Sequence, residues 1–301
     1  MNLKNSLAIL LVFILAPTSA YSENLPLFKQ MAERSNPTTD LSDFERGMSA
    51  YNNGHYNKAI ELLIKSGLNG STIAQYNLGA IYSQGIAIKE DVIEAYKWFR
   101  KAAEQGSDKA QHNVGIAYEN GFGVTKNYEE AAKWYKKSAN QGYAPAQFMV
   151  GSIYDTGLGV ESDSKTAIQW YKKSANQGYA KAQYNLGISY LNGDGLPINK
   201  ADAIKWFIKA GEQGFAEAQH NLGFFYQADE NYTESVYWYK KAAKQEFSKS
   251  QLNLGVLYYL GLGVGGKTPD NISRALSLIK QAKSNGEDVS VAWDMFKPGE
   301  I

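Results

Sequence analysis

The side chains of this sequence best suited to catalysis or metal binding are three histidines and two carboxylates. There is no cysteine, so metal binding or catalysis would depend on His55, His112 and His220 or on acidic groups such as Glu119 and Asp155. General acid–base catalysis needs a carboxyl group whose pKa is raised by an apolar pocket or a close partner. A metal site needs three or four ligands that converge on one ion. The elements that carry these residues decide whether either condition is met.

Those elements belong to an internal repeat. The eleven residues WYKKSANQGYA run from Trp134 to Ala144 and again from Trp170 to Ala180. A second motif, A-Q-x-N-L-G-x-x-Y or a near variant, recurs at intervals of 36 residues and finally 32. Its copies begin at Ala74, Ala110, Ala146, Ala182, Ala218 and Ser250. With a degenerate first copy around Gly47, seven units run from 43 to 286, and such periods are typical of solenoid proteins.

Each unit has the pattern of two helices. Ala110, Val114 and Ala117 fall at helical spacing on one apolar face. The second segment of each unit has its own apolar stripe with lysines opposite, and a glycine such as Gly142 stands where a helix stops. A single helical hairpin leaves its apolar stripe facing water, and stacking against the next copy buries it. We therefore predict an all-α solenoid of about seven helix-turn-helix repeats.

The loop between the two helices carries G-x-G-V, as in Gly121-Phe122-Gly123-Val124. No G-K-[ST] follows and no strand precedes these glycines, so we interpret them as turn formers and not as a phosphate-binding loop.

These motifs, together with the second-helix pattern A-x-x-W-Y/F-x-K-A/S-A-x-x-G, resemble the Sel-1-like repeat family, a relative of the tetratricopeptide repeats. The resemblance implies a right-handed superhelical scaffold for protein–protein interaction, with no enzymatic activity and no cofactor. Many exported bacterial members are implicated in host contact, envelope regulation or motility. The cysteine-rich secreted branch linked to β-lactam binding or hydrolysis is poorly matched, because this sequence has no cysteine.

By the resemblance, the first helices line a concave groove, and three positions of each face it. The predicted partner-binding residues are Tyr76, His112, Ile116, Glu119, Phe148, Asp155, Tyr184, Ile188, His220 and Phe224. A groove with this aromatic and apolar floor suits an extended peptide or a partner helix. The alternative is that the rings only pack between neighbouring helices. No lysine follows any of the A-Q pairs, so a clamp for acidic C-terminal tails is not expected.

The same placement argues against chemistry. His112 and His220 stand three units apart, about 25 Å or more at the usual helix spacing, so they cannot share a metal ion. Glu119 and Asp155 occupy equivalent positions of adjacent units, but a shallow open groove does not raise a carboxyl pKa. His55 reads as a solvated turn residue. We expect no catalytic site, no metal and no cofactor.

Two further repeated residue types have a structural and a binding interpretation. The asparagines could hydrogen-bond a ligand backbone or satisfy main-chain groups between units, and Met149 interrupts their series; they are Asn77, Asn113, Asn185, Asn221 and Asn253. The tryptophans are more typical of an inter-repeat core than of a sugar-stacking platform; they are Trp98, Trp134, Trp170, Trp206 and Trp238.

The ends of the sequence differ from the repeats. Residues 1–20 carry Lys4, an apolar run too short to span a bilayer and small residues before Tyr21, which predicts a signal peptide cleaved near Ala20–Tyr21. Residues 21–42 read as a flexible leader. Residues 287–301 read as a cap or tail, in which Trp293 and Phe296 would cover the last repeat.

Charge is balanced, with 31 basic and 30 acidic residues, and no basic block favours nucleic acid. We expect an exported monomer, periplasmic or secreted and without a stable membrane anchor. Its predicted role is a non-enzymatic scaffold that binds a protein or peptide, with host contact as one use. Two alternatives stay open: an envelope module acting on peptidoglycan or polysaccharide machinery, and a cell-wall or β-lactam hydrolase.

Overall fold

The computed structural model describes residues 42–85 and 88–295, which form fifteen helices and no strand. The all-α prediction is therefore confirmed. The predicted signal peptide, nearly all of the predicted leader, and Phe296 lie outside the described residues. Within them, no helix is long and apolar enough to cross a membrane.

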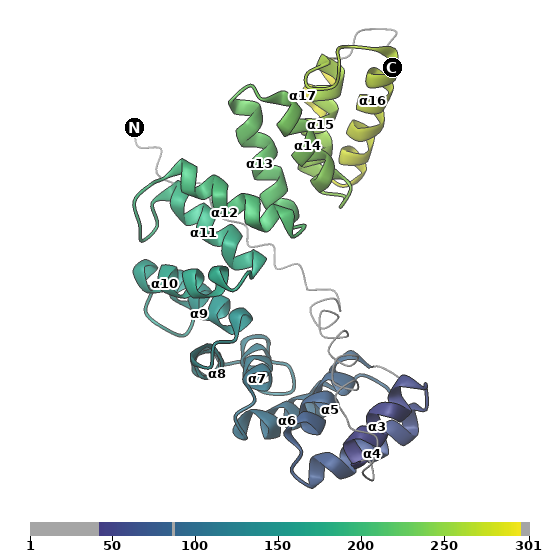
Figure 1. The fold of residues 1–301 in the computed structure, drawn as a ribbon, viewed down its shortest axis with the longest axis vertical. Coiled ribbons are helices and arrows are strands. Elements are labelled where there is room, and N and C mark those ends of the chain that lie inside the picture. Colours follow the sequence, from purple (N-terminus) through teal and green to yellow (C-terminus); the bar gives the residue numbers. More distant parts are fainter. Residues whose placement is uncertain (1–41, 86–87, 296–301) are drawn as a thin grey trace. The chain divides into compact units, whose positions relative to one another are not determined.

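The helices follow one another as antiparallel pairs (Figure 1). Their bounds are α3 Asp43–Asn52, α4 Tyr56–Leu68, α5 Thr72–Gln84, α6 Val92–Glu104, α7 Asp108–Asn120, α8 Tyr128–Asn140, α9 Ala144–Thr156, α10 Ser164–Asn176, α11 Ala180–Asn192, α12 Lys200–Glu212, α13 Ala216–Ala228, α14 Tyr232–Ala243, α15 Ser248–Leu260, α16 Pro269–Ser284 and α17 Ser290–Asp294. The chain divides into two compact units inside α8, unit 1 ending at Trp134 and unit 2 beginning at Tyr135. In each pair the odd-numbered helix is called the first helix and the even-numbered one the second.

Local sequence sets where these helices begin and end. The Asp163 carboxylate accepts hydrogen bonds from the Lys165 and Thr166 backbone N–H groups, 3.0 and 3.3 Å away, which caps the start of α10. First helices such as α11 end at a glycine in the left-handed conformation, as at Gly193 with φ 81°. Gly178 follows α10 with φ 92°, which confirms the predicted stop signal after the second helices.

A glycine in the middle of the first helix lets the second helix of the same repeat pack closely. A Cβ atom added at Gly187 would lie 2.7 Å from a ring carbon of Phe207, and one at Gly223 would lie 2.5 Å from the Tyr239 ring. Both rings are fully buried. The recurring N-L-G motif therefore supplies the flat backbone surface on which a buried aromatic ring rests.

The second glycine of the G-x-G loop has a role beyond forming a turn. At Gly195 an added Cβ would lie 2.6 Å from the Ser164 carbonyl oxygen at the start of α10 in the preceding repeat. A Cβ added at Gly263 would lie even closer to the Tyr232 carbonyl oxygen at the start of α14. The loop backbone thus packs directly on the previous repeat, and this approach requires glycine.

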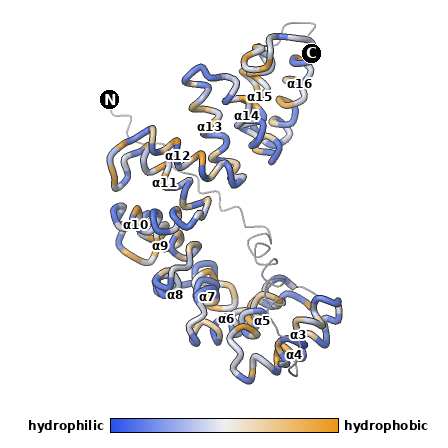
Figure 2. Tube along the Cα trace, viewed as in Figure 1, coloured by the Kyte–Doolittle hydropathy of each residue, from blue (hydrophilic) through white to orange (hydrophobic). Residues whose placement is uncertain are grey.

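Hydrophobic cores lie between successive repeats within each unit. One cluster joins Tyr171 and Ala175 of α10 to Ala182 and Leu186 of α11. Figure 2 shows hydrophobic segments distributed along both units instead of gathered in one. At the end of unit 2, Val289 and Ala292 are buried in the last cluster and Trp293 packs against it.

The core interpretation of the tryptophans is confirmed for Trp98, Trp134 and Trp238, which are buried. In unit 2 the Trp238 indole lies over Gly211 of α12, where an added Cβ would be 3.0 Å from Cζ3 of the indole. Trp170 and Trp206 are only partly buried. Two of the five rings therefore have edges that reach the surface.

Candidate protein-binding surface

The ring that follows each A-Q pair packs between repeats. Phe148 on α9 lies 5.8 Å from Tyr171 of its own repeat and 5.5 Å from Tyr179 before the next. Tyr184 on α11 makes the same pair of contacts, 5.6 Å from Phe207 and 5.1 Å from Phe215, measured between ring centroids.

Two other members of this series follow the same rule. His220 on α13 lies 5.6 Å from Tyr239 and 5.2 Å from Phe247, and in unit 1 Tyr76 lies 5.7 Å from Phe99. The packing interpretation is thus observed at four positions that were predicted to bind a partner. All four side chains keep a partly exposed edge, and contact of that edge with a partner stays a prediction.

The histidines sit in different surroundings. The Nδ1 atom of His220 is 2.9 Å from the Ser250 hydroxyl on α15. The pKa of His220 is lowered to about 4, first by burial and then by nearby Lys249, while Glu287 acts in the opposite direction. Burial likewise lowers the pKa of His112 to about 4, whereas His55 is exposed before α4. Among the described residues, no cluster of histidine and acidic groups could hold a metal ion.

The two candidate carboxylates have separate environments. Asp155, at the end of α9, accepts a hydrogen bond from the Tyr171 hydroxyl at 3.3 Å. Desolvation raises the pKa of Asp155, the tyrosine hydrogen bond lowers it, and Asp194 in the next repeat raises it. Glu119 is partly buried at the end of α7 in unit 1, whereas Asp155 belongs to unit 2. The Glu119–Asp155 pair is therefore divided between the two units.

The repeated asparagines bond to neighbouring repeats. The Asn253 amide on α15 donates to the Tyr239 hydroxyl of the preceding repeat at 3.1 Å. Asn185 on α11 makes the corresponding hydrogen bond to Tyr171 on α10, whereas Asn221 on α13 bonds to Tyr184 on the preceding first helix. The observed partners are tyrosine hydroxyls of neighbouring repeats and not the main-chain groups that the structural interpretation expected.

The positions four residues further along several first helices reach outward, although Ala80 at this position of α5 is buried. Phe224 on α13 is 56% exposed, and Ile188 and Ile116 at the equivalent positions of α11 and α7 are partly exposed. The Phe225 ring lies beside Phe224 in an edge-to-face arrangement, with centroids 6.0 Å apart. Of the ten predicted binding residues, Phe224 is the large apolar side chain with the most accessible surface.

Sequence reasoning missed the glutamine of the A-Q motif. The buried Gln183 on α11 donates from Nε2 to the Ala175 carbonyl oxygen of α10 at 3.1 Å, and its Oε1 accepts from Gln213 after α12 at 2.8 Å. Gln219 and Gln245 repeat this arrangement, with the Gly211 carbonyl as acceptor. One side chain thus connects three helices of two repeats. The A-Q pair, which becomes S-Q in the last copy, together with the Q-G that ends most second helices, was the available signal.

The Sel1 repeat family model matches six segments, residues 72–107, 108–143, 144–179, 180–215, 216–247 and 248–287. Among solved structures, c5321, a protective antigen of uropathogenic Escherichia coli strains with an SLR fold, is 30% identical with a TM-score of 0.73. That comparison covers 93% of this chain but 66% of the antigen, so the chain spans just under two thirds of its length.

A Sel1 repeat protein from Oxalobacter formigenes is also 30% identical, with a TM-score of 0.70, over 83% of this chain and 100% of that one. No curated protein matches the sequence. The six matched segments cover most of the described chain and follow its helical pairs. The chain therefore belongs to the Sel1 repeat family, whose members generally act as non-catalytic scaffolds for protein–protein interaction.

Proposed function

We propose that this chain is an exported adaptor that binds a partner protein or peptide along the outward positions of its first helices. The observation that carries the proposal is the exposed Phe224 side chain, which lies in a series with Ile188 on the preceding first helix. Exposed apolar groups of this kind are typical of partner-binding positions.

The inward positions of the same helices are already engaged. Tyr184 packs against Phe207 and Phe215, and Gln183 is bonded to both neighbouring second helices. A partner therefore meets the edges of Phe148, Tyr184 and His220 rather than their faces. The binding surface is shallow and suits a helix or an extended segment laid across several repeats.

Export and host contact form the finer part of this proposal. The apolar run and small residues of positions 1–20 support a signal peptide that is removed near Ala20–Tyr21. The similar protein from Escherichia coli is described as a protective antigen, and this supports a location outside the cytoplasm with host contact as one use.

Photo-crosslinking tests the binding surface. A photoreactive phenylalanine analogue replaces Phe224 in one variant and Ile198 in the control. Ile198 is 71% exposed in the loop between α11 and α12, so both positions are accessible. We expect one discrete adduct from position 224, lost on competition with unlabelled protein, and none from position 198. Equal labelling from both positions would contradict the proposal.

Export has a separate test. The chain is expressed in a bacterial host, cells are fractionated, and the purified protein is sequenced from its N-terminus. The expected product is found outside the cytoplasm and begins at Tyr21. A cytoplasmic product that still begins at Met1 would overturn the export proposal and leave the binding proposal intact.

A further inference from the structure

The second helices of unit 2 present a regular set of cations over aromatic rings. In each of α10, α12 and α14 a lysine lies three residues after the tryptophan, and its ammonium group stands over the indole. The distances from Nζ to the ring centroid are 3.9 Å for Lys173 over Trp170, 4.2 Å for Lys209 over Trp206 and 4.9 Å for Lys241 over Trp238. Because the three lysines hold equivalent repeat positions, their charges are evenly placed along the second helices.

These three charges are not neutralised by ion pairs. Lys205 pairs with Asp202 at 2.8 Å and Lys200 pairs with Asp229 at 3.0 Å. In the described part of unit 2, by contrast, Lys173, Lys209 and Lys241 have no carboxylate partner. Helix α10 carries three lysines and no acidic residue, α12 three lysines and two acidic residues, and α14 two lysines and one acidic residue. The second-helix face of residues 164–243 is therefore positive although the whole chain is nearly neutral.

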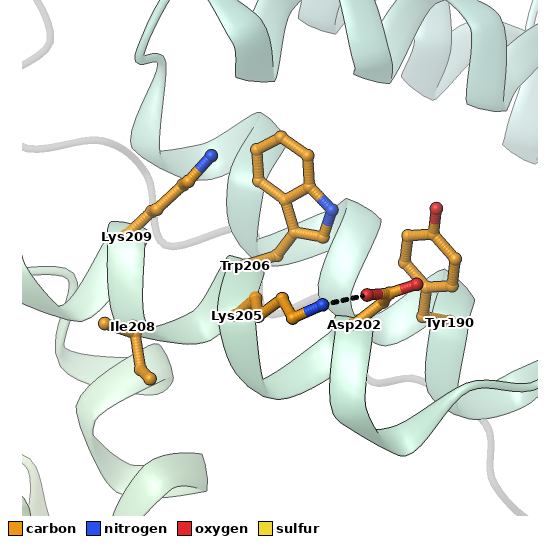
Figure 3. Close-up of a pocket in the computed structure, with 6 residues that line it drawn as sticks. All are labelled: Tyr190, Asp202, Lys205, Trp206, Ile208 and Lys209. Carbon is orange, nitrogen blue, oxygen red and sulfur yellow. Dashed lines mark hydrogen bonds and ion pairs between the residues drawn. The ribbon is translucent and has the colours of Figure 1, made fainter.

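A pocket of about 450 Å³ opens on this face. Its lining residues are Tyr190, Asp202, Lys205, Trp206, Ile208 and Lys209. Figure 3 shows the Trp206 indole standing between Lys209 on one side and Asp202 with Tyr190 on the other. The volume lies within the range of ligand pockets, and the partly exposed indole supplies an apolar wall beside an uncompensated ammonium group.

We propose that the second-helix face of residues 164–243 binds an acidic peptide segment, with one bulky apolar side chain of that segment seated in the Trp206 pocket. This site is separate from the first-helix surface proposed above. Its partner is identified by charge complementarity to Lys173, Lys209 and Lys241 and by the apolar wall of the pocket.

The spacing of the lysines fits an extended peptide. The helices α10, α12 and α14 pack mainly on the first helices between them, so successive lysines stand further apart than the about 8–10 Å of directly packed helices. An extended or polyproline chain rises about 3 Å per residue, so a peptide with glutamate at every third residue offers carboxylates in several registers to the three lysines.

A carbohydrate fits less well, because sugars bind by stacking on an open aromatic face. Here the ammonium groups of Lys173 and Lys209 stand over the Trp170 and Trp206 rings, so a stacked sugar would have to displace a cation, whereas a side chain in the pocket can contact the rest of the Trp206 indole. Nucleic acid, heparin and neutral peptides then become the comparison ligands of the test.

The test measures fluorescence anisotropy of a labelled peptide that carries glutamate at every third position and one phenylalanine between two of them. Binding to the full-length protein is expected to weaken about tenfold in Lys209→Glu, since a charge pair becomes a repulsion. Lys181, which is also exposed and lies on the first helix α11, supplies the matched control Lys181→Glu, which is expected to bind unchanged. Lys173→Glu repeats the test at a second repeat if Lys209→Glu does not fold.

Two peptide variants separate charge from pocket. Replacing the glutamates with glutamine should abolish binding, and replacing the phenylalanine with serine should weaken it severalfold. Equal binding by Lys209→Glu and Lys181→Glu, equal binding of the glutamine peptide, or tighter binding of heparin or duplex DNA than of the acidic peptide would overturn the proposal. Phe224→Ser should leave this peptide's affinity unchanged, so failure here is distinguishable from failure of the first-helix proposal.

Discussion

The first and second helices of a repeat share a core but present different chemistry outward. On first helices such as α13, the ring of His220 and the amides of Gln219 and Asn221 are engaged by neighbouring helices, and the outward position holds Phe224. On second helices such as α12, the outward positions hold lysines and a partly exposed tryptophan. The difference shows that repetition fixes the inward contacts, while the surfaces available to partners are set helix by helix.

Tryptophan substitutions are expected to have the largest effects on stability. They test how far burial differs among the second helices. Trp238→Ala should lower the free energy of unfolding by about 3–5 kcal/mol, because the side chain is 5% exposed and packs over Gly211. Trp170→Ala should cost only about 1–2 kcal/mol, since part of its ring is already in water. Urea denaturation of both variants measures the difference, and equal losses would contradict the burial contrast.

The close approach of paired helices predicts a smaller loss. In Gly223→Ala the new Cβ would meet the Tyr239 ring, and such overpacking typically costs about 1–3 kcal/mol. The double variant with Tyr239→Leu should be less destabilised than the sum of the two single variants, because the clash has been removed. Additive losses in thermal melts would show that the helices do not meet as described.

The glutamine contacts predict a comparable effect from a single polar group. Gln183→Leu removes the donor to the Ala175 carbonyl and the acceptor for Gln213, and an unsatisfied buried group costs about 1–3 kcal/mol. Gln169→Leu on α10 is the control, because Gln169 is exposed. Matching stability of the two variants would mean that the glutamines do not couple the repeats.

A pH dependence is expected from two partly buried histidines, His112 and His220. The pKa values of His112 and His220 are lowered to about 4 in the folded chain, against about 6.5 when unfolded. The unfolded state therefore binds more protons between these values, and stability that is fully present above about pH 6.5 is lost as the pH falls toward 4.

Chemical denaturation at pH values across this window should show a declining free energy of unfolding. His220→Gln should flatten the decline, because one of the two titrating groups is gone. An unchanged slope would indicate that His220 is not held neutral by its packing against Tyr239 and Phe247.

The helical pairs, their stop signals and the core role of most tryptophans could be predicted from the sequence, because each depends on local spacing. Gly178 and Gly193, for example, follow the ends of α10 and α11 at the positions that the repeat predicts. The fate of Tyr184 could not be predicted in the same way. Its ring is engaged by Phe207 and Phe215 from two other elements, so its exposure depends on side chains that no single period relates to it.

The sequence could predict that Phe224 faces outward and that lysines lie opposite the apolar stripe of the second helices, but it could not predict how far each side chain is covered. Periodicity assigns a residue to a helix face, but whether a neighbouring side chain covers it depends on residue size at particular positions. Trp238 is buried over Gly211, whereas Trp206 reaches the surface beside an open pocket. Identical residues at equivalent repeat positions therefore need not be buried to the same extent.

A paired comparison of Phe224→Ser with Tyr184→Ser tests the division of labour most directly. The free energy of unfolding of Phe224→Ser should lie within about 0.5 kcal/mol of that of the unmodified protein, as expected for an exposed position. This variant should nevertheless fail to retain the partner captured from position 224. Tyr184→Ser should have a lower free energy of unfolding than the unmodified protein, because the ring contacts with Phe207 and Phe215 are lost. Full retention of the partner by folded Phe224→Ser would contradict the account.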